Sequence, residues 1–305
     1  MPEKNELEAL VYLLDDSDEE VVKQVTDQLL SYGKSIIPVL EDLSLEKPDD
    51  YPQSKIDDVI QEIQFCEISD QFLNWTQSGA GDLLQGAYLV AKYRYPGLER
   101  EEIEDRINKI KLDVWLELNN HLTPLEKVKK FNYIFYNYYK FQGDVDDYHA
   151  PENSLINKVV EKKKGNPISL AILYSVIAQR LGIPVFGVNL PQHFILAYQD
   201  DRQFPKDNSL QGFNYLTPEQ AGETLFYINA FNRGTVFNKW NIDQFLKQLN
   251  IDKHVMYYEP CSNVDTILRV LRNLAFSFES TEEDKKVNDL NRLHELLEPY
   301  SEGYS

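Results

Sequence analysis

The chain has 305 residues, of which 42% are apolar and 12% aromatic, so it can bury a sizeable core in one or two domains. Its 31 basic and 50 acidic residues give a net charge of -19, and the acidic residues are spread along the whole chain. This balance disfavours binding to nucleic acid or to anionic lipid, because phosphate groups require a basic surface.

The chain also carries no sign of export or membrane insertion. Its N-terminus lacks the apolar core of a signal peptide, and no stretch approaches the roughly 18 consecutive apolar residues of a spanning helix. Cys66 and Cys261 are too few and too far apart for a disulfide framework. We therefore expect a cytoplasmic protein without a membrane partner, and we expect Cys66 in a core because apolar residues surround it.

Residues 1–45 are expected to form a pair of helices that resembles one HEAT-type repeat. The first helix has apolar residues at helical spacing: Leu7, Leu10, Val11 and Leu14. Ser17 and Glu20 have the spacing of a capping box for the second helix. No second copy of the unit follows, so the sequence predicts a lone helical pair, and residues 46–54 read as a polar linker.

The region that follows, residues 55–141, is predicted to be mostly helical. Thr123, Pro124 and Glu126 make a strong helix start, with an N-cap, a proline at the first position and a carboxylate at the third. The helix behind them is rich in aromatic and aliphatic residues: Phe131, Ile134, Phe135 and Tyr138. A stacking surface for nucleic-acid bases is conceivable there, but the helical spacing and the acidic context favour a buried core.

A run from Lys164 to Tyr198 predicts a helix buried on nearly all sides, followed by two strands. Asn166 is a favourable N-cap and Pro167 a favourable first helical residue. Apolar residues cover most of the helix until Gly182 and the proline after it stop it.

Strands are expected at about 185–190, 193–199 and 225–231, with a loop over 200–212 between the last two. Helices return after Gly234. The predicted fold class is α+β, mainly α-helical, with a small antiparallel sheet between helical N- and C-terminal regions.

The run resembles the SirB-type transglutaminase-like family. The matching segments are GNPISL, RLGIP and GVNLPQHFILAY, with LTPLEKV upstream and INAFNRG and LRVLRNL downstream, over roughly residues 70–300. The resemblance implies a transglutaminase-like (papain-like) core at 153–237. That core belongs to a domain at 55–250, with 55–141 as its helical front part, and a helical, TPR-like tail follows at 251–305. It implies no established enzymatic role.

Active members of the wider superfamily use a cysteine, a histidine and an aspartate. Their cysteine begins the central helix, where the helix dipole favours a thiolate, and it lies 15 residues before the glycine that corresponds to Gly182. That position is Pro167 here. The resemblance assigns the histidine to His193 and the aspartate to Asn229, whose amide cannot stabilise an imidazolium as a carboxylate does.

These residues predict a relic catalytic site with a residual cleft, and three functions stay open. The cleft is expected to be lined by Asn166, Pro167, Asn189 and Gln192. The sequence favours a non-catalytic interaction or scaffold module with an unknown protein partner. The second function is a hydrolase or acyl-transferase that uses Ser169 with His193. The third is binding of a small ligand or peptide in the cleft.

Ser169 is a weak candidate for the nucleophile. It lies two residues after Pro167, so its side chain points about 200° away around the helix axis. A hydroxyl near a helix start is expected to bond local backbone.

No cofactor or metal is expected. His149 with Asp144, Asp146 and Asp147 lacks a ligand spacing, and Lys162–Lys164 are expected to form a solvated charged face rather than an anion site.

Overall fold

The structure is a computed structural model that describes residues 4–46, 52–200 and 222–303. The chain divides into two compact units, Met1–Gln71 and Phe72–Ser305, and the division lies within helix α4 (Gln53–Gln77). The linker expected over 46–54 and the loop expected over 200–212 lie mostly outside the described residues. The division predicted from the sequence, into residues 1–45, 55–250 and 251–305, is finer than these two units and stays a prediction.

The first unit is a set of helices around an aliphatic core. Helices α1 (Lys4–Tyr12), α2 (Glu19–Ser31) and α3 (Ile37–Glu46) pack with the beginning of α4. Their buried residues are Leu7, Val11, Leu14, Val25, Leu29, Ile36, Leu40, Leu43, Ile56, Val59 and Ile63. The apolar spacing thus predicted the buried stripe of the first helix.

Two expectations for this unit are wrong. Asp18, rather than Ser17, caps α2, because its carboxylate accepts the backbone N–H of Glu20 at 2.9 Å. Cys66 is exposed, since Phe65 and Ile68 take the buried positions around it.

The second unit contains most of the helices. In chain order they are α5 (Leu83–Arg94), α6 (Arg100–Glu117), α7 (Pro124–Asn132), α8 (Ile156–Lys162), α9 (Pro167–Gln179), α10 (Lys239–Gln248), α11 (Asn263–Glu279) and α12 (Asp284–Leu297). Thr123 and Glu126 form the predicted capping box of α7, which continues into a π-helix, η3 (Tyr133–Tyr138). Phe131 and Phe135 are buried as expected, whereas Tyr138 is exposed.

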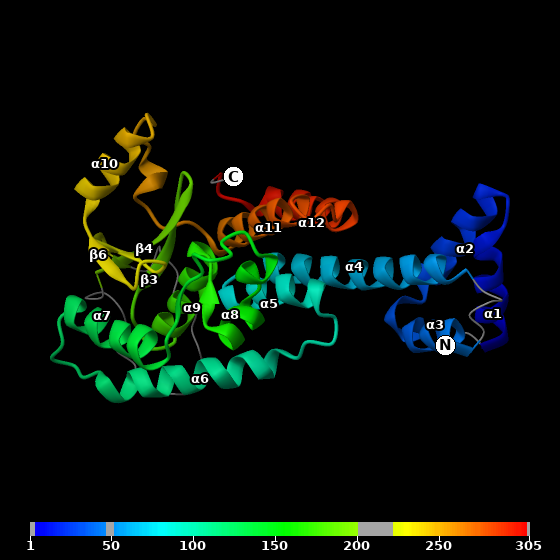
Figure 1. The fold of residues 1–305 in the computed structure, drawn as a ribbon, viewed down its shortest axis with the longest axis horizontal. Coiled ribbons are helices and arrows are strands. Elements are labelled where there is room, and N and C mark those ends of the chain that lie inside the picture. The colour runs from blue at the N-terminus through cyan, green and yellow to red at the C-terminus, as the bar shows by residue number, and fades with distance from the viewer. Residues whose placement is uncertain (1–3, 47–51, 201–221, 304–305) are drawn as a thin grey trace. The chain divides into compact units, whose positions relative to one another are not determined.

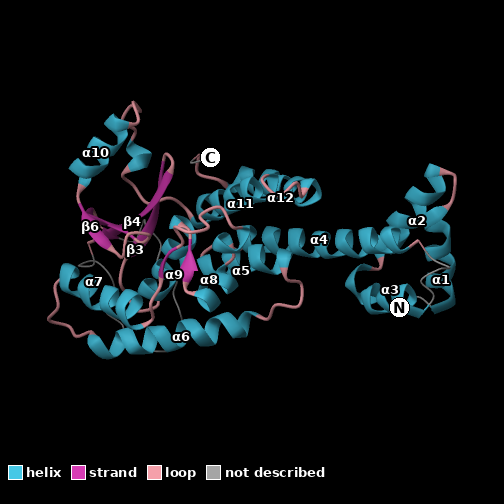
Figure 2. Cartoon of the chain, in the orientation of Figure 1, coloured by secondary structure: helices cyan, strands magenta, loops and turns pink. Residues whose placement is uncertain are grey.

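The sheet of this unit is antiparallel, with strand order β3-β4-β5-β6 (Figure 2). The strands are β3 (Val185–Leu190), β4 (His193–Gln199), β5 (Thr224–Asn229) and β6 (Thr235–Phe237). The apolar runs predicted the first three of these strands; β6 was missed because it has only three residues. A short parallel pair, β1 (Gln142–Gly143) and β2 (Lys164–Gly165), was also missed.

Helix α9 is the centre of this unit (Figure 1). Every residue from Pro167 to Ala178 is buried, and the helix contacts α5, α6, α8, α11, β3 and β4. The predicted all-round burial is therefore confirmed. Before α9, a 3-10 turn, η4 (Pro151–Ser154), precedes α8, and the chain leaves α8 at Lys163, whose φ of 59° is left-handed.

A hydrogen-bond chain ties α9 to the end of the sheet. The Tyr174 hydroxyl donates to Asn132 Oδ1 at 3.0 Å, and Asn132 Nδ2 donates to the carbonyl of Gly234 at 2.8 Å. The Tyr136 hydroxyl donates to the carbonyl of Ala230, also at 2.8 Å. These bonds fix the turn after β5, and with it Asn229.

Replacing Gly86 with alanine is expected to destabilise the second unit by about 1–3 kcal/mol. A Cβ at Gly86 would come within 2.7 Å of Ile267 Cγ1 and 2.8 Å of the Trp75 ring, so α5 would have to move away from α11. Urea unfolding followed by far-UV circular dichroism measures the change.

Gly97→Ala is the matched control, because nothing lies within 4 Å of its added Cβ. We expect it to change the stability by less than about 0.5 kcal/mol. Equal stabilities for the two variants would contradict the close packing of α5 on α11.

Candidate functional site

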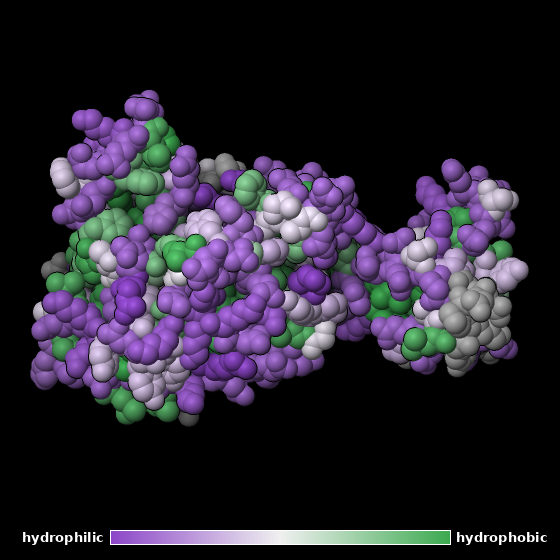
Figure 3. Space-filling view, in the orientation of Figure 1, coloured by the Kyte–Doolittle hydropathy of each residue, from purple (hydrophilic) through white to green (hydrophobic). Residues whose placement is uncertain are grey.

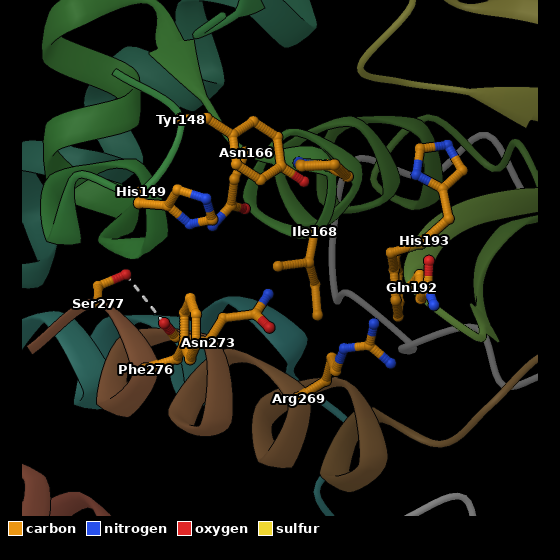
Figure 4. Close-up of a pocket in the computed structure, with 12 residues that line it drawn as sticks. Tyr148, His149, Asn166, Ile168, Gln192, His193, Arg269, Asn273, Phe276 and Ser277 are labelled. Carbon is orange, nitrogen blue, oxygen red and sulfur yellow. Dashed lines mark hydrogen bonds between the residues drawn. The ribbon is translucent and has the colours of Figure 1, made fainter. Parts of the chain in front are cut away.

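A pocket of about 120 Å³ lies at the start of α9 (Figure 4). Its walls come from the loop before η4, the first turn of α9, the β3–β4 turn and α11. The lining residues are Tyr148, His149, Asn166, Pro167, Ile168, Gln192, His193, Phe194, Arg269, Asn273, Phe276 and Ser277. The tertiary structure thus brings together Asn166, Pro167, Gln192 and His193, which the sequence had singled out from two separate segments.

The start of α9 is held by a buried hydrogen-bond network around Asn166. Its Oδ1 accepts the backbone N–H of Ser169 at 3.0 Å, and its Nδ2 donates to Ser154 Oγ at 2.8 Å. Pro167 follows as the first helical residue, where its fixed φ suits the helix and its missing N–H costs nothing. The helix start is therefore rigid and closed by its own side chains.

Ser169 is part of this network and does not reach into the pocket. Its Oγ accepts the backbone N–H of Asn166 at 3.1 Å and donates to the Asn166 carbonyl at 3.2 Å. Only 1% of the residue is exposed. Its hydroxyl serves as the second half of a capping box, as its position near a helix start suggested.

His193 and Asn229 meet across neighbouring strands. His193 begins β4 and Asn229 ends β5, and the amide Nδ2 lies 3.1 Å from His193 Nε2. The orientation of the amide is set by its oxygen, because Oδ1 accepts the backbone N–H of Asn232 at 3.0 Å. Asn229 therefore presents a donor to the ring.

This donor decides where the histidine carries its proton. An amide nitrogen can only donate, so Nε2 must accept, and the neutral ring of His193 then holds its hydrogen on Nδ1. An aspartate at the same position would accept a hydrogen from Nε2 and leave Nδ1 as a base. With Asn229, the remaining ring nitrogen is a donor, which is the wrong form for activating a nucleophile.

Two causes lower the pKa of His193 below its usual 6.5. The larger is the burial of the ring, which disfavours the charged form, and the second is the positive charge of Arg269. The imidazole is therefore neutral at neutral pH.

Arg269 is a charged residue of the pocket that the sequence did not single out. It lies on α11, lines the pocket and donates from Nη1 to Asn189 Oδ1 at 2.8 Å. Asn189, on β3, thus accepts a hydrogen bond from a residue that lines the pocket. The signal in the sequence was an arginine between Leu268 and Val270, inside an otherwise apolar stretch.

The β3–β4 turn presents Gln192 to the pocket. Leu190 pairs with His193, so Pro191 and Gln192 form a two-residue turn, and Gln192 has a φ of 57°. Proline at the second position and a positive φ at the third are typical of a type II turn. A side chain other than glycine in this conformation is strained, which is common at functional sites.

Of the other candidates, His149 lines the pocket, and the lysines have structural roles. Lys162 pairs with Glu152, and Lys164 bonds Asp144 and Asp146, so these lysines are engaged in surface ion pairs. In the residues that the structure describes, no group of three or more acidic, histidine or cysteine side chains could hold a metal ion. Burial raises the pKa of the Cys261 thiol to about 12, which makes it a poor nucleophile.

The described helices also include none that combines the length and apolar character needed to cross a membrane.

Comparison with known proteins places the chain among transglutaminase-like proteins. Residues 101–272 match the family described as the transglutaminase-like superfamily. A UPF0162 protein of Xylella fastidiosa is 28% identical over 220 residues, which is 70% of this chain and 72% of the relative. F-box only protein 21 of Pongo abelii is 29% identical over 192 residues, 62% of this chain but 27% of that protein. No solved structure matches the chain.

Ser169→Ala is expected to lower the free energy of unfolding by about 1–2 kcal/mol, because the mutation removes the capping hydroxyl of α9. Ser175→Ala, on the same buried helix, is the control. Its Oγ has no hydrogen-bond partner among the described residues, so its loss should be neutral or stabilising. Chemical unfolding of the three proteins measures this, and an unchanged stability in Ser169→Ala would contradict the capping role.

Asn229→Asp is expected to move the proton of His193 to Nε2 and to raise its pKa, because a carboxylate accepts a hydrogen from the ring and stabilises its cation. Two-dimensional ¹H–¹⁵N NMR of the imidazole, recorded as a pH titration, reports both the nitrogen that carries the proton and the pKa of the ring. The wild-type ring should show the Nδ1–H form. An Nε2–H form in the wild type would contradict the orientation of Asn229.

The same titration has a consequence for stability. Because the folded pKa of His193 is lowered, its contribution to stability is complete above pH 6.5. That contribution is lost as the pH falls from 6.5 through the folded pKa. As the pH falls through this range, the free energy of unfolding of His193→Gln should therefore decrease less than that of the wild type.

Proposed function

Because the chain belongs to the transglutaminase-like superfamily, we propose that it is a non-catalytic member that acts as an interaction or scaffold module. The observation that carries the proposal is the donor that Asn229 presents to His193, opposite a helix start occupied by Pro167. A thiolate, a base and an orienting carboxylate would be needed for acyl transfer. This site offers a proline, a histidine protonated on Nδ1 and an amide.

The finer assignment is to the SirB-type family with a papain-like core. In support, α9 packs on β3 and β4, and His193 opens the strand after the turn, which is the order that the resemblance implies. We further propose that the core at 153–237 is flanked by helical regions at 1–45 and 251–305 that dock protein partners in the cytoplasm.

A second surface supports protein interaction. Large apolar side chains on the outer face of α6 are more than half exposed: Leu112, Trp115 and Leu116. Figure 3 shows hydrophobic atoms at the lower left of the molecule, where Figure 1 places α6 and α7. Contiguous exposed apolar side chains are typical of protein-binding surfaces. One relative carries the name F-box only protein 21, although this chain covers only 27% of it.

Ligand binding in the cleft is the second candidate, and the pocket favours it. One part of its wall is formed by buried residues, Asn166, Pro167, Ile168 and Phe194 among them, and polar groups line the rest together with apolar ones. The hydrolase alternative has no comparable support, because both hydrogen bonds of the Ser169 hydroxyl go to Asn166.

Site-specific photo-crosslinking tests the interaction module. A benzophenone amino acid is placed at exposed Gln192 in the cleft, at Trp115 on α6, and at Lys247 on α10 as an exposed control in the same unit. We expect protein adducts from Gln192 or Trp115 in cells that make the chain, identified by mass spectrometry. Equal adducts from all three positions, or none, would contradict the proposal.

A further inference from the structure

We propose that the pocket at the start of α9 binds a carboxylate group through Arg269. This inference rests on the proposal that the cleft is a binding site rather than a catalytic one. It adds the chemical class of the ligand, which neither the fold nor the relatives specify.

Arg269 is the first reason. It is mostly buried, and its hydrogen bond goes to a neutral amide, Asn189. Within the described part of the chain it pairs with no carboxylate, although the chain has 50 acidic residues. The other arginines near the core, Arg100 and Arg180, do pair with carboxylates. A buried charge without a counter-ion is costly, so it is retained where a ligand supplies the opposite charge.

The direction of the guanidinium is the second reason. Figure 4 shows it extending from α11 toward the part of the pocket bordered by Gln192 and His193. A fixed guanidinium presents paired N–H donors that match the two oxygens of a carboxylate. His193 lines the same pocket and carries a further donor on Nδ1. The pocket is thus lined by donors from α11 and β4.

The charge of the pocket favours a single negative charge. Among the lining residues, Arg269 is the one arginine or lysine, and no aspartate or glutamate is among them. A phosphate dianion would leave a net negative charge in a protein that already has a net charge of -19. A carboxylate is balanced by one arginine.

The remaining walls favour a flat apolar group next to the carboxylate. Ile168, Phe194 and Phe276 line the pocket, and its volume of about 120 Å³ holds several water-sized groups. Benzoate combines both features and is a suitable probe. Benzamide has the same shape without the charge and serves as its matched control.

Titration of the full chain with benzoate, followed by NMR of the His193 and Arg269 side chains, tests the proposal. We expect saturable binding of benzoate and at least tenfold weaker binding of benzamide. Arg269→Gln should weaken benzoate binding at least tenfold. Arg272→Gln should not, because Arg272 is exposed on the same helix and does not line the pocket.

Three results would overturn the proposal: equal binding of benzamide, unchanged binding by Arg269→Gln, or displacement of benzoate by inorganic phosphate at lower concentration than benzoate itself. The Arg269→Lys variant separates loss of the guanidinium contact from loss of the native fold. It retains the charge but loses the paired donors, so benzoate binding should weaken while far-UV circular dichroism stays native. A lysine variant that binds as tightly as the wild type would also count against recognition by the guanidinium.

Short peptides distinguish the sources of the carboxylate. A peptide with a free C-terminus and no acidic side chain is compared with its C-terminal amide, and with an amidated peptide that contains one internal aspartate. Binding of the first alone identifies a chain terminus, and binding of the third identifies an acidic side chain. If none displaces benzoate, the site takes a small carboxylate.

Failure of this inference is distinguishable from failure of the interaction module. Protein adducts at Gln192, together with benzoate binding that Arg269→Gln leaves unchanged, would leave the module intact and reject the carboxylate contact. Benzoate binding without position-specific adducts would reject the module and keep the pocket as a small-molecule site.

Discussion

The capping network at the start of α9 is the constraint on which the rest of the second unit depends. Asn166 is bonded through its side chain to Ser169 and Ser154, and through its backbone N–H to the Asn153 carbonyl as well. Because α9 is buried on all sides, its orphan N–H groups cannot be satisfied by water, so side chains must supply the acceptors. The rigid helix start then sets the position of one wall of the pocket.

The same network supports the proposed non-catalytic role. A proline in the first turn stabilises the helix but brings no nucleophile, and Ser169 is consumed by the cap. On the opposite wall, Asn229 holds His193 in the tautomer that donates. Both departures support the proposal of a non-catalytic site, and Arg269 places a positive charge in the same pocket.

Local signals in the sequence predicted much of this correctly. The capping box at Thr123, the N-cap at Asn166, the buried central helix and three strands of the sheet follow from residue types at fixed spacings. Errors arose where two adjacent residues could each serve as the N-cap, as when Asp18 rather than Ser17 caps α2. Strands as short as β1, β2 and β6 carry too few residues for a pattern, so only their pairing defines them.

The sequence by itself determined the order of elements, the proline at position 167 and the amide at position 229, because these depend on residue identity alone. The tertiary structure decided which atom of Asn229 faces His193, since the backbone N–H of Asn232 binds the amide oxygen. It also decided that Arg269, 76 residues beyond His193, lines the same pocket. Contacts between distant segments arise from packing of whole elements, and no local pattern encodes them.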